Sequence, residues 1–91
     1  MEITKMFLYT VYDKIAFKYG PIFESPNPAT ANRDFQIMLK NSATQFPNDY
    51  ALYEIGCIER NTETGISGKI YNDPLPVSFK KPEKQEELFN A

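Results

Sequence analysis

The sequence predicts a small α+β domain: a four-stranded, mostly antiparallel sheet in the order strand, strand, helix, strand, strand, with the helix packed on one face. Three observations predict it. Residues 3–24 are crowded with aromatic and β-branched side chains, which favour strands. Helix-start residues stand at Asn27 and Pro28. Two further extended segments, residues 50–60 and 66–71, flank a turn-forming stretch.

The first two predicted strands are residues 3–12 and 15–24, interrupted by Asp13 and Lys14. Neither face of the first strand is plainly polar, because its alternating residues are apolar or aromatic on both sides. Both faces therefore need cover. Pro21 cannot donate a hydrogen bond to a neighbouring strand, so we expect it at an edge, at a bulge or on an unpaired side.

The helix is expected to begin at Asn27, whose side chain can accept from exposed N–H groups, and at Pro28, which has no N–H to lose. It should end near Lys40 or Asn41. Ile37 falls outside its apolar stripe. The stripe that we expect to pack on the sheet consists of Ala31, Phe35, Met38 and Leu39.

The second half of the chain reads as a turn at residues 46–49 and a hairpin. Gly56, inside the strand 50–60, indicates a bulge or a close approach of a neighbouring strand. Gly65 is expected to take a positive φ in the hairpin loop. Residues 72–76 should end regular structure, since two prolines in three residues remove donors. Residues 77–79 could then dock as an extended strap.

The chain length limits the number of domains. Ninety-one residues are expected to make one domain, residues 1–79, followed by a charged C-terminal tail, residues 80–91. A frayed, solvated end is the simpler reading of this tail, and a docking peptide using Leu88 and Phe89 is the alternative. So small a domain buries a modest fraction of its surface, so we expect a homo-oligomer.

The composition argues against several classes of function. No His is present, Cys57 is the only cysteine, and the four glycines stand apart from one another. We therefore expect no catalytic residues, no metal site, no cofactor and no enzymatic activity. The chain has no apolar run of membrane-spanning length and no secretory signal at its N-terminus. These features predict a soluble intracellular protein without a membrane partner.

An uncovered sheet face suggests nucleic-acid binding. One helix can cover one side of the sheet only, and bases of a single strand stack well on exposed aromatic rings. The net charge of −2 and the pI near 5.0 mean that any such site must be local. A sheet core or a sheet-to-sheet dimer would use the same aromatics, and on spacing alone it is favoured. The candidate residues are Lys5, Tyr9, Tyr12, Lys14, Lys18, Tyr19 and Lys69.

Five short motifs in the same order resemble those of a known family. They are YTVYDK at 9–14, YGP at 19–21 with Phe23, ANRDF at 31–35, PNDYALYEIG at 47–56 and TG at 64–65. This set resembles the small non-structural protein of gokushoviruses, single-stranded DNA phages of the Microviridae. The resemblance covers about residues 7–65 and leaves out the charged tail. It carries over no binding or catalytic residues.

The resemblance implies a phage protein of the host cell cytoplasm that is absent from the virion and binds single-stranded DNA. The implied role is genome replication or the switch from replication to packaging. The alternative is a protein-interaction module that recruits or inhibits a phage or host replication protein without binding DNA. A small hydrolase or nuclease, which would need a metal ion and an essential carboxylate, is the third reading.

Overall fold

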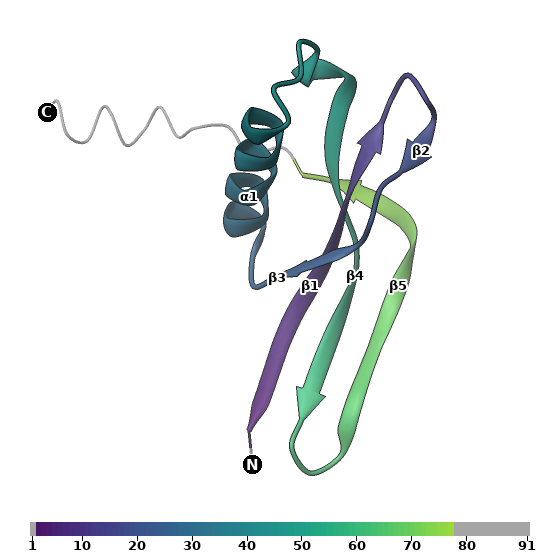
Figure 1. Cartoon of the computed structure of the whole chain (residues 1–91). Coiled ribbons are helices and arrows are strands. Elements are labelled where there is room, and N and C mark those ends of the chain that lie inside the picture. Colours follow the sequence, from purple (N-terminus) through teal and green to yellow (C-terminus); the bar gives the residue numbers. More distant parts are fainter. Residues whose placement is uncertain (1, 78–91) are drawn as a thin grey trace, which may run out of the picture.

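The computed structural model describes residues 2–77, and everything said of the structure refers to these residues. They form an α+β fold with one α-helix, one short 3-10 helix and an antiparallel sheet of five strands (Figure 1). The helix is α1 (Pro28–Asn41), and the 3-10 turn is Pro47–Asp49. The strands are β1 (Ile3–Asp13), β2 (Lys18–Tyr19), β3 (Phe23–Ser25), β4 (Tyr50–Asn61) and β5 (Gly65–Pro76).

The sheet is built around the pairing of β1 with β4. The strand order is β2-β1-β4-β5, and β3 pairs with β1 further along the same edge. All four pairings are antiparallel. The prediction of an α+β fold with an antiparallel sheet is therefore confirmed.

The predicted count of four strands is wrong, because the segment 15–24 forms two short strands instead of one. Residues 14–17 make a turn and β2 is two residues long. Gly20 still donates to the carbonyl of Val11, and the chain leaves the ladder at Pro21 and Ile22 before β3. Pro21 has no N–H for a neighbouring strand, which explains why pairing stops there. The expectation for Pro21 thus holds.

The helix begins and ends where the sequence predicts. Asn27 is its N-cap, and the Asn27 side chain accepts a hydrogen bond of 2.7 Å from the N–H of Thr30. Ala31 and Phe35 are buried and Leu39 is half-buried, whereas Met38 is 45% exposed. The predicted stripe is therefore right in its first half and only partly right in its second.

The core is small. Its buried apolar side chains are Tyr9, Ala31, Phe35 and Leu52, so one turn of the helix meets the middle of β1 and β4. The half-buried side chains packed against it are Phe7, Val11, Phe23, Leu39, Tyr50 and Val77. Val77 is also tied to the sheet, since its N–H donates to the carbonyl of Leu52.

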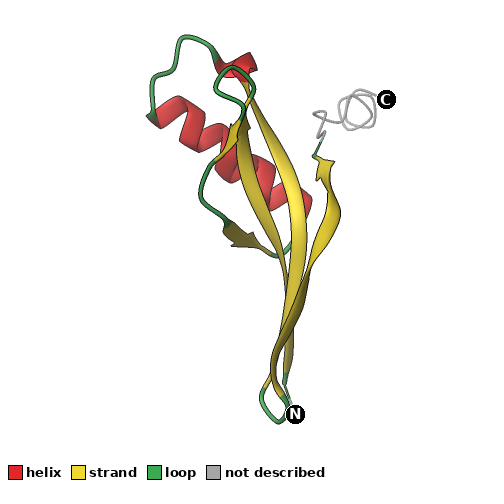
Figure 2. Cartoon of the chain, turned by 90° about the vertical axis from the view of Figure 1, so that its right-hand side faces the viewer, coloured by secondary structure: helices red, strands yellow, loops and turns green. Residues whose placement is uncertain are grey.

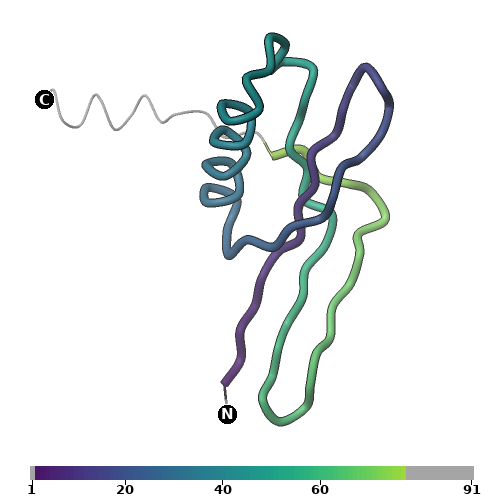
Figure 3. The backbone as a smooth tube through the Cα atoms, viewed as in Figure 1, coloured from purple at the N-terminus to yellow at the C-terminus, as the bar shows by residue number. Residues whose placement is uncertain are grey.

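The described chain divides into two parts that we call the body and the arm. The arm consists of residues 3–8 of β1, 56–61 of β4 and 65–70 of β5. The body is the rest, with the helix lying beside the upper part of the sheet. In Figure 2 the arm is a narrow ribbon that extends beyond the helix. Figure 3 shows that its tip, the loop before β5, lies far from α1.

The two faces of the sheet differ. We call the side on which Tyr9 and Leu52 meet the helix the helix face, and the other side the open face. Residues directly paired across an antiparallel ladder share a face, and neighbours along a strand alternate. Thr10, paired with Tyr53, therefore lies on the open face.

Both ladders change register at the boundary between arm and body. Leu8 pairs with Gly56 and Tyr9 with Glu54, so Ile55 is the extra residue of a bulge in β4. On the other side of β4, Glu54 pairs with Leu75 but Gly56 pairs with Ile70. The expectation of a bulge or close approach at Gly56 is confirmed.

The predicted end of regular structure at residues 72–76 is wrong. Residues 71–74 lie outside the ladder at the register change, and β5 resumes pairing with Leu75 and Pro76. The strand tolerates its prolines because one of them, Pro74, falls where no ladder donor is needed. Gly65 has φ of 98°, as the hairpin prediction required. The rest of the predicted strap, the tail and its Leu88 and Phe89 lie outside the described residues.

Candidate nucleic-acid interface

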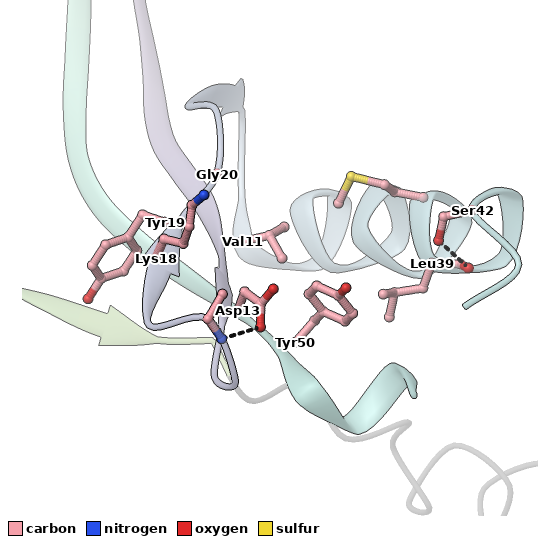
Figure 4. A pocket seen from close by; sticks show the side chains of 10 residues that line it. Val11, Asp13, Lys18, Tyr19, Gly20, Leu39, Ser42 and Tyr50 are labelled. Carbon is pink, nitrogen blue, oxygen red and sulfur yellow. Dashed lines mark hydrogen bonds between the residues drawn. The ribbon is translucent and has the colours of Figure 1, made fainter. Parts of the chain in front are cut away.

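Three tyrosines cluster on the open face of the body. Tyr12 and Tyr19 are cross-strand partners whose ring centroids lie 4.7 Å apart. Tyr53, from β4, meets Tyr12 edge-on at 5.9 Å and Tyr19 edge-on at 6.2 Å. Tyr19 is 53% exposed, and Figure 4 shows its ring pointing away from the helix, on the opposite side of the strands from Val11 and Tyr50. Tyr19 is therefore the exposed ring of the cluster, and Tyr12 and Tyr53 are half-buried beside it.

The turn beside this cluster carries two of the candidate lysines. Lys14 and Lys18 stand at the two ends of the turn that joins β1 to β2, and both are exposed. Asp13 holds the turn, because its carboxylate accepts hydrogen bonds of 3.0 Å from the N–H groups of Ile15 and Ala16. The charge of Asp13 is therefore directed into the turn.

The tip of the same turn is apolar. Phe17 is 79% exposed and has φ of 57°, a left-handed conformation that is unfavourable for a bulky residue. Ile15 is 69% exposed. The turn therefore exposes an aromatic side chain between two lysines, and the backbone at Phe17 is strained.

Tyr9 does not belong to this surface. Its side chain is fully buried in the core, on the helix face, and its hydroxyl donates a hydrogen bond of 3.1 Å to Glu54. Tyr71 from β5 donates to the other oxygen of the same carboxylate at 2.9 Å. Glu54 therefore ties β1, β4 and β5 together where the arm joins the body.

The two tyrosines bound to Glu54 are hard to ionise. Burial, followed by the hydrogen bond to Glu54, raises the pKa of Tyr71 to about 12. The same two causes, in the same order, raise the pKa of Tyr9. A phenolate formed beside the Glu54 carboxylate would face a like charge in a partly desolvated place. With both tyrosines neutral, this cluster therefore links the arm to the body through hydrogen bonds to Glu54.

Lys5 and Lys69 lie on the helix face of the arm, away from the tyrosine cluster. Lys5 sits over the ring of Phe7 at 5.5 Å, and Lys69 sits over the ring of Tyr71 at 5.9 Å. Between them stands Cys57, which pairs with both Phe7 and Lys69. The structure therefore separates these two lysines from Tyr12 and Tyr19, which occupy the opposite face.

A pocket lies between the turn and the C-terminal end of the helix (Figure 4). Its wall is mostly apolar and includes Val11, Leu39 and Tyr50, while Asp13 and Lys18 are its charged lining residues. Lys18 pairs with Asp13 across the ladder, so its side chain starts on the helix side of the turn.

Sequence reasoning missed two members of this surface, Tyr53 and Phe17. Tyr53 was placed on a strand, but its position beside Tyr12 depends on the register between β1 and β4, which local sequence does not encode. Phe17 could have been noticed as an aromatic residue between Lys14 and Lys18. Its outward direction depends on the left-handed backbone of the turn.

The acidic and thiol side chains of the described part of the chain are dispersed. Within residues 2–77, no three His, Cys, Asp or Glu side chains gather to hold a metal ion. The helices in this part of the chain are also too short or too polar to cross a membrane.

The fold and the surface define a small α+β protein with an antiparallel sheet whose open face carries exposed aromatic side chains. The family model described as Phage ORF5 protein matches residues 6–79. The chain therefore belongs to the Phage ORF5 protein family. No curated protein and no solved structure was found to match it.

Proposed function

We propose that this chain is a non-structural phage protein that binds single-stranded DNA in genome replication or in the switch from replication to packaging. The motifs in residues 9–65 suggest a gokushovirus, of the Microviridae, and so a protein that acts in the cytoplasm of the host cell. Membership of a phage family supports the viral part of the proposal.

The observation that carries the proposal is the cluster of exposed Tyr19 with half-buried Tyr12 and Tyr53, beside a turn with two lysines. Bases stack on such rings without regard to sequence, and each stacked base contributes about 1–3 kcal/mol. Lys14 and Lys18, at the two ends of the turn that joins β1 to β2, supply positive charge near the rings, with Lys18 starting on the helix side of the turn. Phe17, at the tip of the same turn, offers a further ring.

Lys5, Lys69 and Tyr9 do not join this proposed site. The two lysines occupy the helix face of the arm, and Tyr9 is in the core. The proposed site therefore consists of Tyr12, Tyr19, Tyr53, Phe17, Lys14 and Lys18. It is small and local, which suits a chain of net charge −2.

Fluorescence anisotropy of a labelled single-stranded oligonucleotide, titrated at two salt concentrations, tests the proposal. An RNA strand and a DNA duplex serve as competitors. The double variant Lys14→Glu, Lys18→Glu should bind more weakly and with a smaller salt slope. Unchanged binding by this variant would refute the assignment of the site.

A matched control is available in the same chain. The double variant Lys5→Glu, Lys69→Glu changes the net charge by the same amount but alters the helix face of the arm. It should retain most of the affinity of the wild type. Equal losses in both double variants would mean that overall charge, and not the tyrosine surface, governs binding.

The second candidate function is a protein-interaction module that recruits or inhibits a phage or host replication protein without binding DNA. The observation that favours it is the exposed apolar tip formed by Ile15 and Phe17, since such side chains also serve as anchors in protein interfaces. Deleting residues 80–91 separates the readings. Binding of DNA through the sheet should survive the deletion, whereas recruitment through the tail should not.

A further inference from the structure

The pocket between the β1–β2 turn and the C-terminal end of the helix has the size and the wall of a small-ligand site. Its volume is about 400 Å³, and ligand pockets in proteins measure about 300–1,000 Å³. Val11, Leu39 and Tyr50 form part of its wall, and all three are half-buried. Such a pocket holds a flat apolar or aromatic group, whose polar substituents meet the few polar groups of the wall.

Asp13 supplies a hydrogen-bond acceptor to this pocket. Its oxygen Oδ1 accepts from the N–H groups of Ile15 and Ala16, and no group within residues 2–77 donates to Oδ2. In Figure 4 the Asp13 carboxylate lies next to Val11 and Tyr50. A carboxylate disfavours a second anion nearby and binds N–H donors. The pocket therefore favours an uncharged group that carries an N–H donor.

Lys18 supplies a positive charge at the rim of the same pocket. Its side chain is exposed and starts on the helix side of the turn, and among the described residues it makes no ion pair. The next residue, Tyr19, directs its ring to the open face, and β2 is the strand at this edge of the sheet. A DNA strand that leaves the Tyr19 ring thus reaches the pocket by passing around β2 alone. It meets Lys18 on the way.

We propose that this pocket takes one unstacked base of the bound single strand, a base with an exocyclic amino group, while Lys18 binds the adjoining phosphate. The inference rests on the proposed DNA binding and adds a second subsite to it. The apolar wall accepts the base, and Oδ2 of Asp13 accepts from its amino group, as carboxylates accept from N4 of cytosine. Splayed bases of single strands are commonly bound in this way, by their faces and their edges.

The expected signature of the pocket is a preference between pyrimidines. Cytosine has an amino group where thymine has the carbonyl oxygen O4, and two acceptors, O4 and Oδ2, repel each other. The tyrosine rings stack on any base, so a preference must come from the pocket. The wild type should bind oligo(dC) at least about fivefold more tightly than oligo(dT), which corresponds to one hydrogen bond.

Fluorescence anisotropy with labelled oligo(dC) and oligo(dT) of equal length tests the proposal. In Asp13→Asn the amide oxygen still accepts from the N–H groups of the turn, but an NH2 group replaces the second acceptor. The affinity ratio between the two oligonucleotides should fall to about one or invert. Circular dichroism checks that the variant folds. A ratio that Asp13→Asn leaves unchanged would overturn the proposal.

Asp49→Asn is the matched control, because it changes the net charge by the same amount near the same turn. The carbonyl of Asp49 accepts from the N–H of Lys14, but Asp49 does not line the pocket. This variant should keep the affinity ratio of the wild type. Equal loss of the ratio in both variants would mean that net charge sets the preference, and would overturn the assignment to Asp13.

Methyl NMR locates the base. The methyl groups of Met38 and Leu39, which line the pocket, should shift more with oligo(dC) than with oligo(dT). Unchanged methyl resonances with oligo(dC) would place the base elsewhere. If the same resonances shift when residues 80–91 are deleted without DNA present, the chain's own tail occupies the pocket, and the proposal is overturned.

The base pocket and the DNA-binding function fail in different ways. If the wild type binds neither oligonucleotide, DNA binding itself is refuted, and the pocket with it. If it binds oligo(dC) and oligo(dT) equally, DNA binding stands and the base pocket is overturned.

Discussion

β1 and β4 run through both the body and the arm, but the helix covers them only in the body. In the body, β1 and β4 lie against the helix and bury Tyr9 and Leu52. In the arm, the same two strands continue with β5, and large side chains such as Ile66 and Ile70 remain exposed. The comparison teaches that the fold stabilises itself at one end only. The other end gains little apolar burial from the described chain, so we expect it to be the less stable part.

The largest expected effect is the loss of a core side chain in the body. Leu52 is 3% exposed and contacts the buried helix residues. Leu52→Ala should lower the free energy of unfolding by about 2–5 kcal/mol, because it removes buried methyl groups and leaves a cavity. Urea denaturation measures this change.

The counterpart in the arm sharpens the comparison. Ile66→Ala should change the unfolding free energy of the monomer by less than about 0.5 kcal/mol, since the side chain is 70% exposed. The two variants are compared at the same low protein concentration, because any self-association would add to the apparent stability. Equal losses would contradict the division into a packed body and an uncovered arm.

A glycine in the arm is expected to matter more than the exposed isoleucine does. A Cβ at Gly68 would lie 2.5 Å from the carbonyl oxygen of Cys57 in β4, and a Cβ at Gly56 would meet the carbonyl oxygen of Lys69. Both neighbours are backbone atoms and cannot move aside without disturbing the ladder. Gly68→Ala should therefore cost about 1–3 kcal/mol in urea denaturation.

The effect of Gly68→Ala should be local. Amide exchange should accelerate in residues 56–61 and 65–70, while the helix and the paired residues 9–12 keep their protection. The matched control is Gly20→Ala, because a Cβ there would make only an ordinary contact of 3.4 Å with the carbonyl of Val11. Uniform loss of protection in Gly68→Ala would mean that arm and body unfold as one unit.

A smaller effect is expected at the start of the helix. Asn27→Ala removes the acceptor of the Thr30 N–H and should destabilise the body by about 1 kcal/mol. Asn27→Asp keeps the acceptor and serves as the control. Thermal unfolding of both variants measures the difference, and equal melting temperatures would show that the cap contributes nothing.

The stability contributed by the Glu54 cluster, which links body and arm, should decrease at alkaline pH. The pKa of Tyr71 is raised from 10.0 to about 12, so its contribution to stability is complete below pH 10 and is lost as the pH rises towards 12. The Tyr71→Phe variant lacks this ionisation. It should lose less stability than the wild type over that interval, by about 1 kcal/mol after an allowance for solvent.

Urea denaturation at pH 9 to 12 measures how the free energy of unfolding changes with pH, and wild type is compared with Tyr71→Phe. Glu54→Gln is a second test, since it removes the charge that opposes the phenolate. It should also flatten the alkaline profile. Parallel profiles of wild type and Tyr71→Phe would contradict the role of this tyrosine.

Local signals in the sequence were sufficient for part of the fold. The Asn27 cap, the positive φ of Gly65 and the bulge near Gly56 each follow from one or two residues, and each is confirmed. The segment 15–24 was harder. Its strand-forming residues predicted one strand, but the missing donor of Pro21 and a turn of residues 14–17 divide it.

The candidate site depended on information that is not local. The alternation of β1 already separates Tyr9 and Tyr12 onto opposite faces, but only the pairing with β4 and the position of the helix show that Tyr9 is the buried one. The sequence left open whether Lys69 shares a face with Tyr19, and the ladder places it on the opposite face. The resemblance in residues 9–65 could indicate a phage protein, but it could not assign a face to any side chain.

The body carries the proposed site for single-stranded DNA, and the arm carries none of its residues. Hydrogen–deuterium exchange of the wild type, with and without a single-stranded oligonucleotide, tests this division most directly. The oligonucleotide should slow exchange in residues 12–20 and leave residues 56–70 unchanged. Oligonucleotide protection confined to the arm, or none at all, would contradict the account.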